Sequence, residues 1–158
     1  MRHLIFSILV LSGIIRAEAQ TLDNYTLQQF QNRVLQDNDT LYVVNFWATW
    51  CSPCVKELPY FINLSSEMAQ QPVKFILMSL DASGDGNKVA AFLNRKKIRL
   101  ETHLFTEADP NVWINALEPS WQGSIPATFL YHKGAKVSFQ EGSFESEKDL
   151  KTFIKNHK

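Results

Sequence analysis

Two cysteines, Cys51 and Cys54, are separated only by Ser52 and Pro53, and the chain has no other cysteine. A pair at this spacing opens and closes as a disulfide with little change in conformation, so it indicates thiol-disulfide exchange. A purely structural bridge is a poor alternative, because a loop with two intervening residues constrains the unfolded chain very little. Any thiol chemistry of this chain must therefore pass through these two residues.

The cysteine pair lies between a predicted strand and a predicted helix. Leu41–Trp47 is rich in β-branched and aromatic residues without clean alternation, which is typical of a strand buried on both faces. Residues 52–70 follow a helical pattern that begins at the cysteines. Pro53 is acceptable in a first helical turn, whereas Pro59 should kink the helix interior. The dithiol is thus expected at the N-terminus of a helix.

A helix N-terminus favours a thiolate, because its backbone N–H groups have no partner within the helix. We therefore expect Cys51 to be the nucleophile, and Cys54, one turn into the helix, to resolve the mixed disulfide. Glu57 follows three residues later on the same helix face, where a partly desolvated carboxylate would exchange a proton with Cys54 and raise the thiol pKa values. The alternative for Glu57 is a solvated surface residue.

The other elements predict an α/β domain with a parallel strand-helix-strand core that ends in a hairpin and a helix. The predicted helices cover residues 25–35, 87–97, 111–117 and 147–156, and the remaining predicted strands cover 73–80, 103–106, Ala127–His132 and 136–141.

The run NFWATWCSPC from Asn45 to Cys54, followed by Glu57, resembles the thioredoxin fold and, within it, the TlpA/ResA-like periplasmic thiol-disulfide oxidoreductases. A second matching motif is GSIPATF, residues 123–129. Cytosolic thioredoxins carry an acidic residue where this chain has Asn45, and the TlpA/ResA group shares both the asparagine and the glutamate. Over residues 21–158, the order of the predicted helices and strands also matches that of this family. The resemblance implies a central mixed sheet flanked by helices, with the extra strand and helix insertion typical of this group.

In this family the proline that matches Pro126 is cis and lies against the dithiol, so the resemblance implies a cis Ile125–Pro126 bond here. The expected substrate-binding residues are Trp50, Ser52, Pro53 and Ile125. Trp50 would form an apolar rim beside Cys51. Ser52 and Pro53 would tune the reduction potential through the hydrogen bonds available to the Cys51 sulfur.

The function implied by the resemblance is reduction of disulfides in exported client proteins, in cytochrome c maturation or a related pathway. A membrane electron donor of the CcdA or DsbD type would recharge the dithiol, since an isolated dithiol is oxidised in an oxidising compartment. No cofactor beyond the Cys51–Cys54 disulfide and no metal is expected.

Two functions of other kinds stay open. The first is a dithiol oxidant or isomerase that forms or shuffles disulfides, which would show a much less negative reduction potential and a strongly acidic Cys51. The chain would be a copper-binding chaperone of the same fold if His132 joined the two thiolates as a ligand. Zinc would need a second pair of ligands at motif spacing, and His103, His132 and His157 stand apart.

Other conspicuous residues have structural interpretations. Trp47 is expected in the core, because a strand that leads into the active turn must be packed. Trp113 and Trp121 fit either the core or a partner surface. Residues 81–86 imitate the first half of a calcium loop, but Phe92 occupies the position that requires glutamate, so a plain strand-to-helix loop is expected.

Residues 1–19 have the pattern of a signal peptide: a short basic start, an apolar stretch from Leu4 to Ile15, and the small residues Ala17 and Ala19 at the cut site. An uncleaved membrane anchor is the alternative, but the apolar stretch falls short of the roughly 20 residues that span a bilayer. Cleavage after Ala19 would leave a domain of residues 20–158, exported to the periplasm. Its 14 basic and 15 acidic residues give no electrostatic reason to bind nucleic acid, and we expect a monomer.

Overall fold

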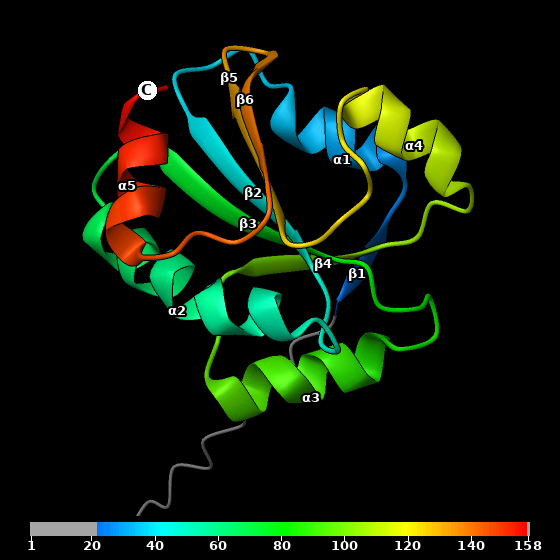
Figure 1. Cartoon of the computed structure of the whole chain (residues 1–158). Helices are drawn as coiled ribbons and strands as arrows, with labels where there is room; N and C mark the ends of the chain where they lie inside the picture. The colour runs from blue at the N-terminus through cyan, green and yellow to red at the C-terminus, as the bar shows by residue number, and fades with distance from the viewer. Residues whose placement is uncertain (1–21, 158) are drawn as a thin grey trace, which may run out of the picture.

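The computed structural model describes residues 22–157, in which a mixed sheet carries helices on both faces (Figure 1). The strands are β1 Asp23–Tyr25, β2 Leu41–Trp47, β3 Val73–Ser79, β4 Glu101–Phe105, β5 Ala127–His132 and β6 Ala135–Glu141. The helices are α1 Leu27–Val34, α2 Ser52–Glu67, α3 Gly86–Lys96, α4 Pro110–Leu117 and α5 Glu147–Lys155.

The sheet has six strands in the order β1-β4-β3-β2-β5-β6. The pairs β1 with β4, β4 with β3, and β3 with β2 are parallel, whereas β5 pairs antiparallel with both β2 and β6. This confirms the predicted thioredoxin-like arrangement of a parallel core that ends in a hairpin and a helix. Helix α3, strand β4 and helix α4 come between strand β3 and the hairpin.

The helices form two layers, because alternate residues of each strand point to opposite faces of the sheet. Helices α1 and α4 pack on one face against an aromatic cluster. Helices α2, α3 and α5 cover the other face (Figure 1). Strand β2 is buried along its whole length, as its composition predicted, so the residues that follow it enter the site from the middle of the sheet.

Helix α2 begins directly after Cys51, as predicted, with Pro53 in its first turn. It continues through Pro59 and ends at Glu67, three residues before the predicted end. The predicted 73–80, 87–97, 111–117, 136–141 and 147–156 elements differ from the observed ones by no more than one residue at either end.

Two predicted elements, the helix over residues 25–35 and the strand over residues 103–106, need correction. Residues 25–35 do not form one helix: Tyr25 belongs to β1, and α1 begins after Thr26, whose side chain and that of Gln29 form a capping box. The Tyr25 ring stacks on His103 of β4 with the ring centroids 3.8 Å apart. The predicted strand 103–106 begins earlier, at Glu101. The first difference comes from the pairing of β1 with β4, and the second comes from the pairing of Glu101 and Thr102 with β3. A local pattern reveals neither pairing.

The predicted signal peptide, residues 1–19, lies outside the described residues. Within residues 22–157, no helix has the length and apolar character needed to span a membrane.

Candidate functional site: the disulfide and its surroundings

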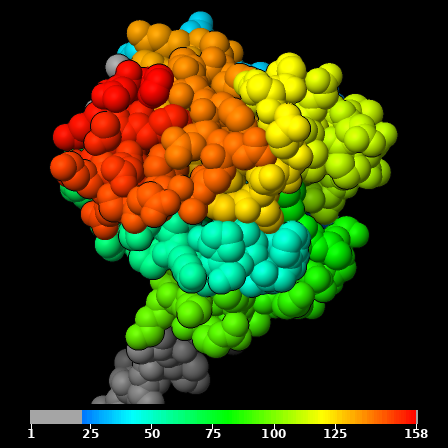
Figure 2. Space-filling view, viewed as in Figure 1, coloured from blue at the N-terminus to red at the C-terminus, as the bar shows by residue number. Residues whose placement is uncertain are grey.

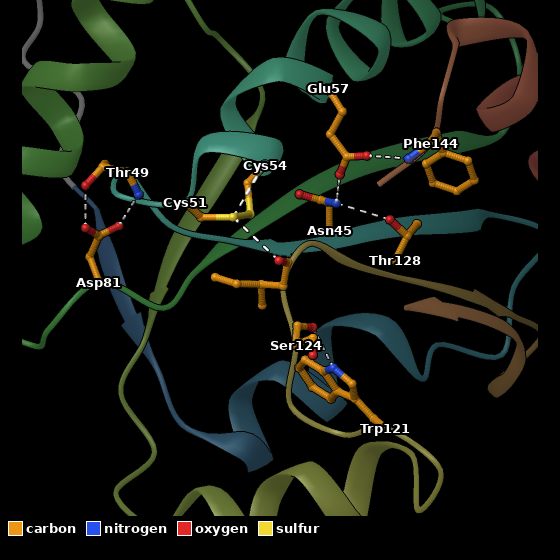
Figure 3. The surroundings of a disulfide bond; sticks show 11 residues. Asn45, Thr49, Cys51, Cys54, Glu57, Asp81, Trp121, Ser124, Thr128 and Phe144 are labelled. Atoms are coloured by element: carbon orange, nitrogen blue, oxygen red, sulfur yellow. Dashed lines mark hydrogen bonds between the residues drawn. A yellow bond between two sulfur atoms is a disulfide. The ribbon is translucent and has the colours of Figure 1, made fainter. Parts of the chain in front are cut away.

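Cys51 and Cys54 form a disulfide at the N-terminus of α2 (Figure 3). Cys51 is the N-cap of this 16-residue helix, and its sulfur accepts a hydrogen bond from the Cys54 backbone N–H at 3.3 Å. Cys51 is 6% exposed and Cys54 is fully buried. The first cysteine is therefore the one that a partner can reach, and the unpaired N–H groups of the helix are directed at its sulfur.

The segment before β5 lies against the disulfide. The Ile125–Pro126 peptide bond is cis, as the resemblance implied, and the Ile125 carbonyl oxygen is 3.6 Å from Cys51 Sγ. Trp121 anchors this segment, because its indole N–H donates to the Ser124 carbonyl oxygen at 2.8 Å. Figure 2 shows the segment next to the surface formed by residues near position 50.

The two tryptophans that the sequence left undecided are core residues: Trp113 is 5% and Trp121 is 4% exposed. Trp47 is fully buried, as predicted. Trp50, in contrast, is 66% exposed. A tryptophan this exposed beside the disulfide offers a large apolar contact to a partner.

Trp50 and Ile125 border a hollow of about 530 Å³ beside the disulfide. Its other walls come from the ends of β3 and β4, the loops that follow them, α4 and the segment before β5: Leu80, Asp81, Ala82, Ser83, Phe105, Thr106, Glu107, Ala108, Pro110, Trp113, Ile114 and Gly123. Ser52 and Pro53 are exposed at the start of α2. The structure therefore brings the expected substrate-binding residues to one surface around Cys51.

Glu57 is a buried residue of α2 and only 1% exposed, so the solvated alternative is wrong. Its two carboxylate oxygens accept hydrogen bonds from Asn45 Nδ2 and from the Phe144 backbone N–H, each at 2.9 Å (Figure 3). Burial raises the pKa of Glu57 from the usual 4.5 to about 7, because the loss of solvation outweighs these two hydrogen bonds. Glu57 is therefore poised to exchange a proton near neutral pH.

Asn45 connects Glu57 to the hairpin. Its side-chain nitrogen also donates to Thr128 Oγ1 at 3.1 Å, and Thr128 is the residue paired with Asn45 across β2 and β5. From the sequence, Asn45 was predicted only as a residue shared with the TlpA/ResA group, and Thr128 had no predicted role. The partnership arises from strand register between segments far apart in the chain.

Asp81 is a further site residue that sequence reasoning placed in a plain loop. It is 2% exposed, and its carboxylate accepts hydrogen bonds from the Thr49 backbone N–H at 2.9 Å, the Thr49 hydroxyl at 2.5 Å and the Ser79 hydroxyl at 2.8 Å. Asp81 thus ties the turn that carries Cys51 to the end of β3 (Figure 3). Its position after a buried parallel strand was the available signal, because such strands end at the same edge of the sheet as the dithiol.

His132 does not approach the cysteines, which contradicts the geometry of the copper alternative. It ends β5, where the neighbouring Tyr131 pairs with Tyr42 near the start of β2, whereas Cys51 follows the opposite end of β2. At about 3.3 Å per residue, His132 lies about 16 Å along the strand from Ala127. Among the described residues, no group of three or more His, Cys, Asp or Glu side chains is placed to hold a metal ion.

Comparison with known proteins agrees with this geometry. The family described as Redoxin matches residues 15–112. The thiol-disulfide oxidoreductase ResA of Bacillus thuringiensis (strain Al Hakam) is 30% identical over 112 residues, which cover 71% of this chain and 60% of that relative. This chain therefore spans less than two thirds of the length of that relative.

Solved structures share the fold. A thiol:disulfide interchange protein of the thioredoxin family from Chlorobium tepidum TLS aligns with a TM-score of 0.61 and 22% identity, covering 75% of this chain and 79% of that one. StoA from Bacillus subtilis aligns with a TM-score of 0.56 and 25% identity, covering 73% of this chain and 84% of that one.

Proposed function

We propose that this chain, which belongs to the Redoxin family, is a thiol-disulfide oxidoreductase that reduces disulfides of other proteins through Cys51 and Cys54. The observation that carries the proposal is the position of Cys51. Its sulfur caps α2, lies beside the cis-proline segment and is the more exposed of the pair. The similarity to ResA, a thiol-disulfide oxidoreductase, supports the same activity.

The reaction runs in two exchanges. In the first, the Cys51 thiolate attacks one sulfur of the client disulfide, that S–S bond breaks, and the other client sulfur leaves as a thiolate that takes up a proton. In the second, Cys54 loses its proton and attacks Cys51 Sγ, and the remaining client sulfur leaves in the same way. The client gains two electrons, and the protein is left as the Cys51–Cys54 disulfide.

We assign Glu57 as the group that takes up the proton of Cys54. Its pKa of about 7 allows it to exist as a base at neutral pH and to release the proton afterwards. Glu57 also lies at the wall of a hollow of about 290 Å³, together with Pro53, Lys56, Tyr60, Ser143, Phe144 and Glu145, which provides a route to solvent.

The proposed clients are exported proteins, including the apocytochromes of cytochrome c maturation, and the proposed compartment is the periplasm. A membrane dithiol donor of the CcdA or DsbD type would return two electrons after each cycle. The chain would act as a monomer, with no cofactor other than its own disulfide.

The reduction potential of the Cys51–Cys54 couple tests the direction of the reaction. The protein would be equilibrated with thiol buffers of defined potential and its dithiol fraction measured. A value near that of thioredoxin, about −270 mV, is expected for a reductant. A value near that of DsbA, about −120 mV, would overturn the proposed direction and make the protein a disulfide donor.

Single cysteine variants test the order of the two exchanges. Cys54→Ser is expected to accumulate a mixed disulfide between Cys51 and a protein client, because the resolving sulfur is missing. Cys51→Ser is the matched variant, and it should trap no client because Cys54 is fully buried. Trapping by Cys51→Ser in place of Cys54→Ser would reverse the assignment of the two sulfurs.

A further inference from the structure

Asn45 is a polar residue in an otherwise apolar row of β2. On the face that α2 covers, Leu41 and Val43 pack in one apolar cluster and Trp47 packs in the next, with Asn45 between them. Asn45 is fully buried. A buried carboxamide is stable only when its polar atoms have hydrogen-bonding partners, so each of its two ends needs an explanation.

The nitrogen end of Asn45 is fully used. Nδ2 donates to Glu57 Oε1 at 2.9 Å and to Thr128 Oγ1 at 3.1 Å. These partners also set the orientation of the amide, because reversing it would direct its oxygen at an ionised carboxylate. The oxygen end, Oδ1, is buried and has no hydrogen-bonding partner among the residues that the structure describes.

Figure 3 shows where this oxygen points. The carboxamide oxygen of Asn45 is directed toward Cys54, on the side of the amide opposite Glu57 and Thr128. In the disulfide state the Cys54 sulfur has no hydrogen to donate. After reduction, Cys54 carries an S–H group, which is a hydrogen-bond donor.

We infer that Asn45 is the positioning residue for Cys54: in the dithiol state its Oδ1 accepts the Cys54 S–H, while its Nδ2 holds the Glu57 carboxylate. This inference deepens the proposed function and rests on it for its catalytic meaning. The amide favours the neutral thiol for as long as Glu57 is ionised, because a hydrogen bond to the neutral form opposes ionisation. When Glu57 is protonated, the amide is released to turn its N–H toward a Cys54 thiolate. One side chain thereby links the proton states of Glu57 and Cys54.

The groups around this pair are few among the described residues. Glu57 comes from α2, Thr128 from β5 is neutral, and the segment before α5 contributes the Phe144 backbone N–H. Lys56 and Glu145 border the hollow on the outer side of Glu57. Asp81 lies on the Thr49 side of the disulfide, where its oxygens are engaged by Thr49 and Ser79.

The test is a titration of reduced protein labelled with ¹³C at the cysteine Cβ, followed by NMR. Cys51→Ser identifies the Cys54 signal. We expect Asn45→Ala to lower the pKa of Cys54 by about one unit, because the acceptor of its S–H is lost and Glu57 loses a donor that favours its charged form. Asn45→Asp should raise the Cys54 pKa instead, because a carboxylate oxygen still accepts the S–H and adds negative charge.

The opposite signs separate this role from packing, which would change the free energy of unfolding without shifting the thiol pKa in opposite directions. Thr128→Val is the matched control, since it removes the other partner of Nδ2 while Glu57 still holds the amide, and it should leave the Cys54 pKa unchanged. If Asn45→Ala does not fold, Asn45→Ser has the same expected sign. An unchanged Cys54 pKa in the Ala or Ser variant, or a shift of the same sign in Ala and Asp, would overturn the inference. The titration needs no client, so its outcome is independent of the reduction potential that tests the proposed function.

Discussion

At Glu57, burial and hydrogen bonding act on one carboxyl group in opposite directions. Desolvation raises the pKa, whereas the donors from Phe144 and Asn45 lower it, and desolvation prevails to give a pKa of about 7. A carboxyl group with this pKa binds a proton in the folded protein between about pH 4.5 and 7, where the unfolded chain has already released it. Folding stability from this group is therefore fully present below pH 4.5 and decreases as the pH rises through 7.

Replacing Glu57 by Gln should remove this pH dependence. The free energy of unfolding of the wild type, relative to Glu57→Gln, should decrease by about 3 kcal/mol between pH 4 and pH 8. Denaturant unfolding of the disulfide form at both pH values measures it. Glu145→Gln, which replaces an exposed carboxyl beside the same hollow, is the control: it keeps Glu57, so the free energy of unfolding of this variant should decrease with pH as in the wild type. Parallel pH profiles for wild type and Glu57→Gln would contradict the assigned environment of this residue.

Among the secondary-structure elements, β2, β3 and α2 meet at the site because β2 and β3 are parallel and end at the same edge of the sheet. The turn from β2 to α2 is held there by two kinds of contact. The Leu80 N–H donates to the Trp47 carbonyl oxygen at 2.8 Å, which extends the pairing of the strands. Asp81 then binds both the backbone and the side chain of Thr49. The position of Cys51 thus depends on a carboxylate that belongs to the next strand.

Removing the Asp81 carboxylate should loosen this turn. Asp81→Ala leaves the Thr49 N–H and the two hydroxyl groups without their acceptor, so we expect the free energy of unfolding to fall by about 2 kcal/mol and disulfide exchange to slow. Urea unfolding and the rate of reduction of a protein disulfide measure the two effects. Asp85→Ala is the matched control: Asp85 precedes α3 without a side-chain capping bond, and its ion pair with Lys88 is exposed. Equal losses in the two variants would show that Asp81 has no special role.

On the scale of the whole molecule, one surface gathers residues from five parts of the chain. Trp50 follows β2, and the hollow that it borders is also lined by the ends of β3 and β4, by α4 and by the segment before β5. Strand β4 and helix α4 therefore contribute to the wall of this hollow, and β4 also lies in the sheet between β1 and β3. A protein client would contact this wall, whereas a small disulfide would need only Cys51.

Trp50→Ala should therefore discriminate between clients by size. We expect kcat/KM for a protein disulfide to fall about tenfold, because exposed tryptophans at the centre of an interface often contribute more than 1 kcal/mol. The rate with a small aromatic disulfide should change little. Val112→Ala removes another exposed apolar side chain, on α4 but outside the hollow, and should leave both rates unchanged. A similar loss with the small disulfide would place Trp50 in the chemistry of the sulfurs instead of in client binding.

Much of this architecture was predictable from local patterns. The cysteine spacing, the buried strand before it and the helix that begins directly after Cys51 all depend on neighbours in the chain, and each was found where expected. Resemblance added the cis Ile125–Pro126 bond, which the local sequence does not specify. The order of strands and helices was also correct, apart from β1 and the start of β4.

Only the tertiary structure revealed which polar groups meet at the site. Glu57 is buried, and its carboxylate accepts a hydrogen bond from the Phe144 N–H, 87 residues away in the chain. Asn45 meets Thr128 across 83 residues because β2 and β5 pair in one particular register. Burial and hydrogen bonding are properties of surroundings, and surroundings built from distant segments leave no periodic signal in the sequence. Residue type and spacing thus determined the chemistry that this chain can carry out, and the packing of distant segments decided which side chains position the sulfurs and at what pH they act.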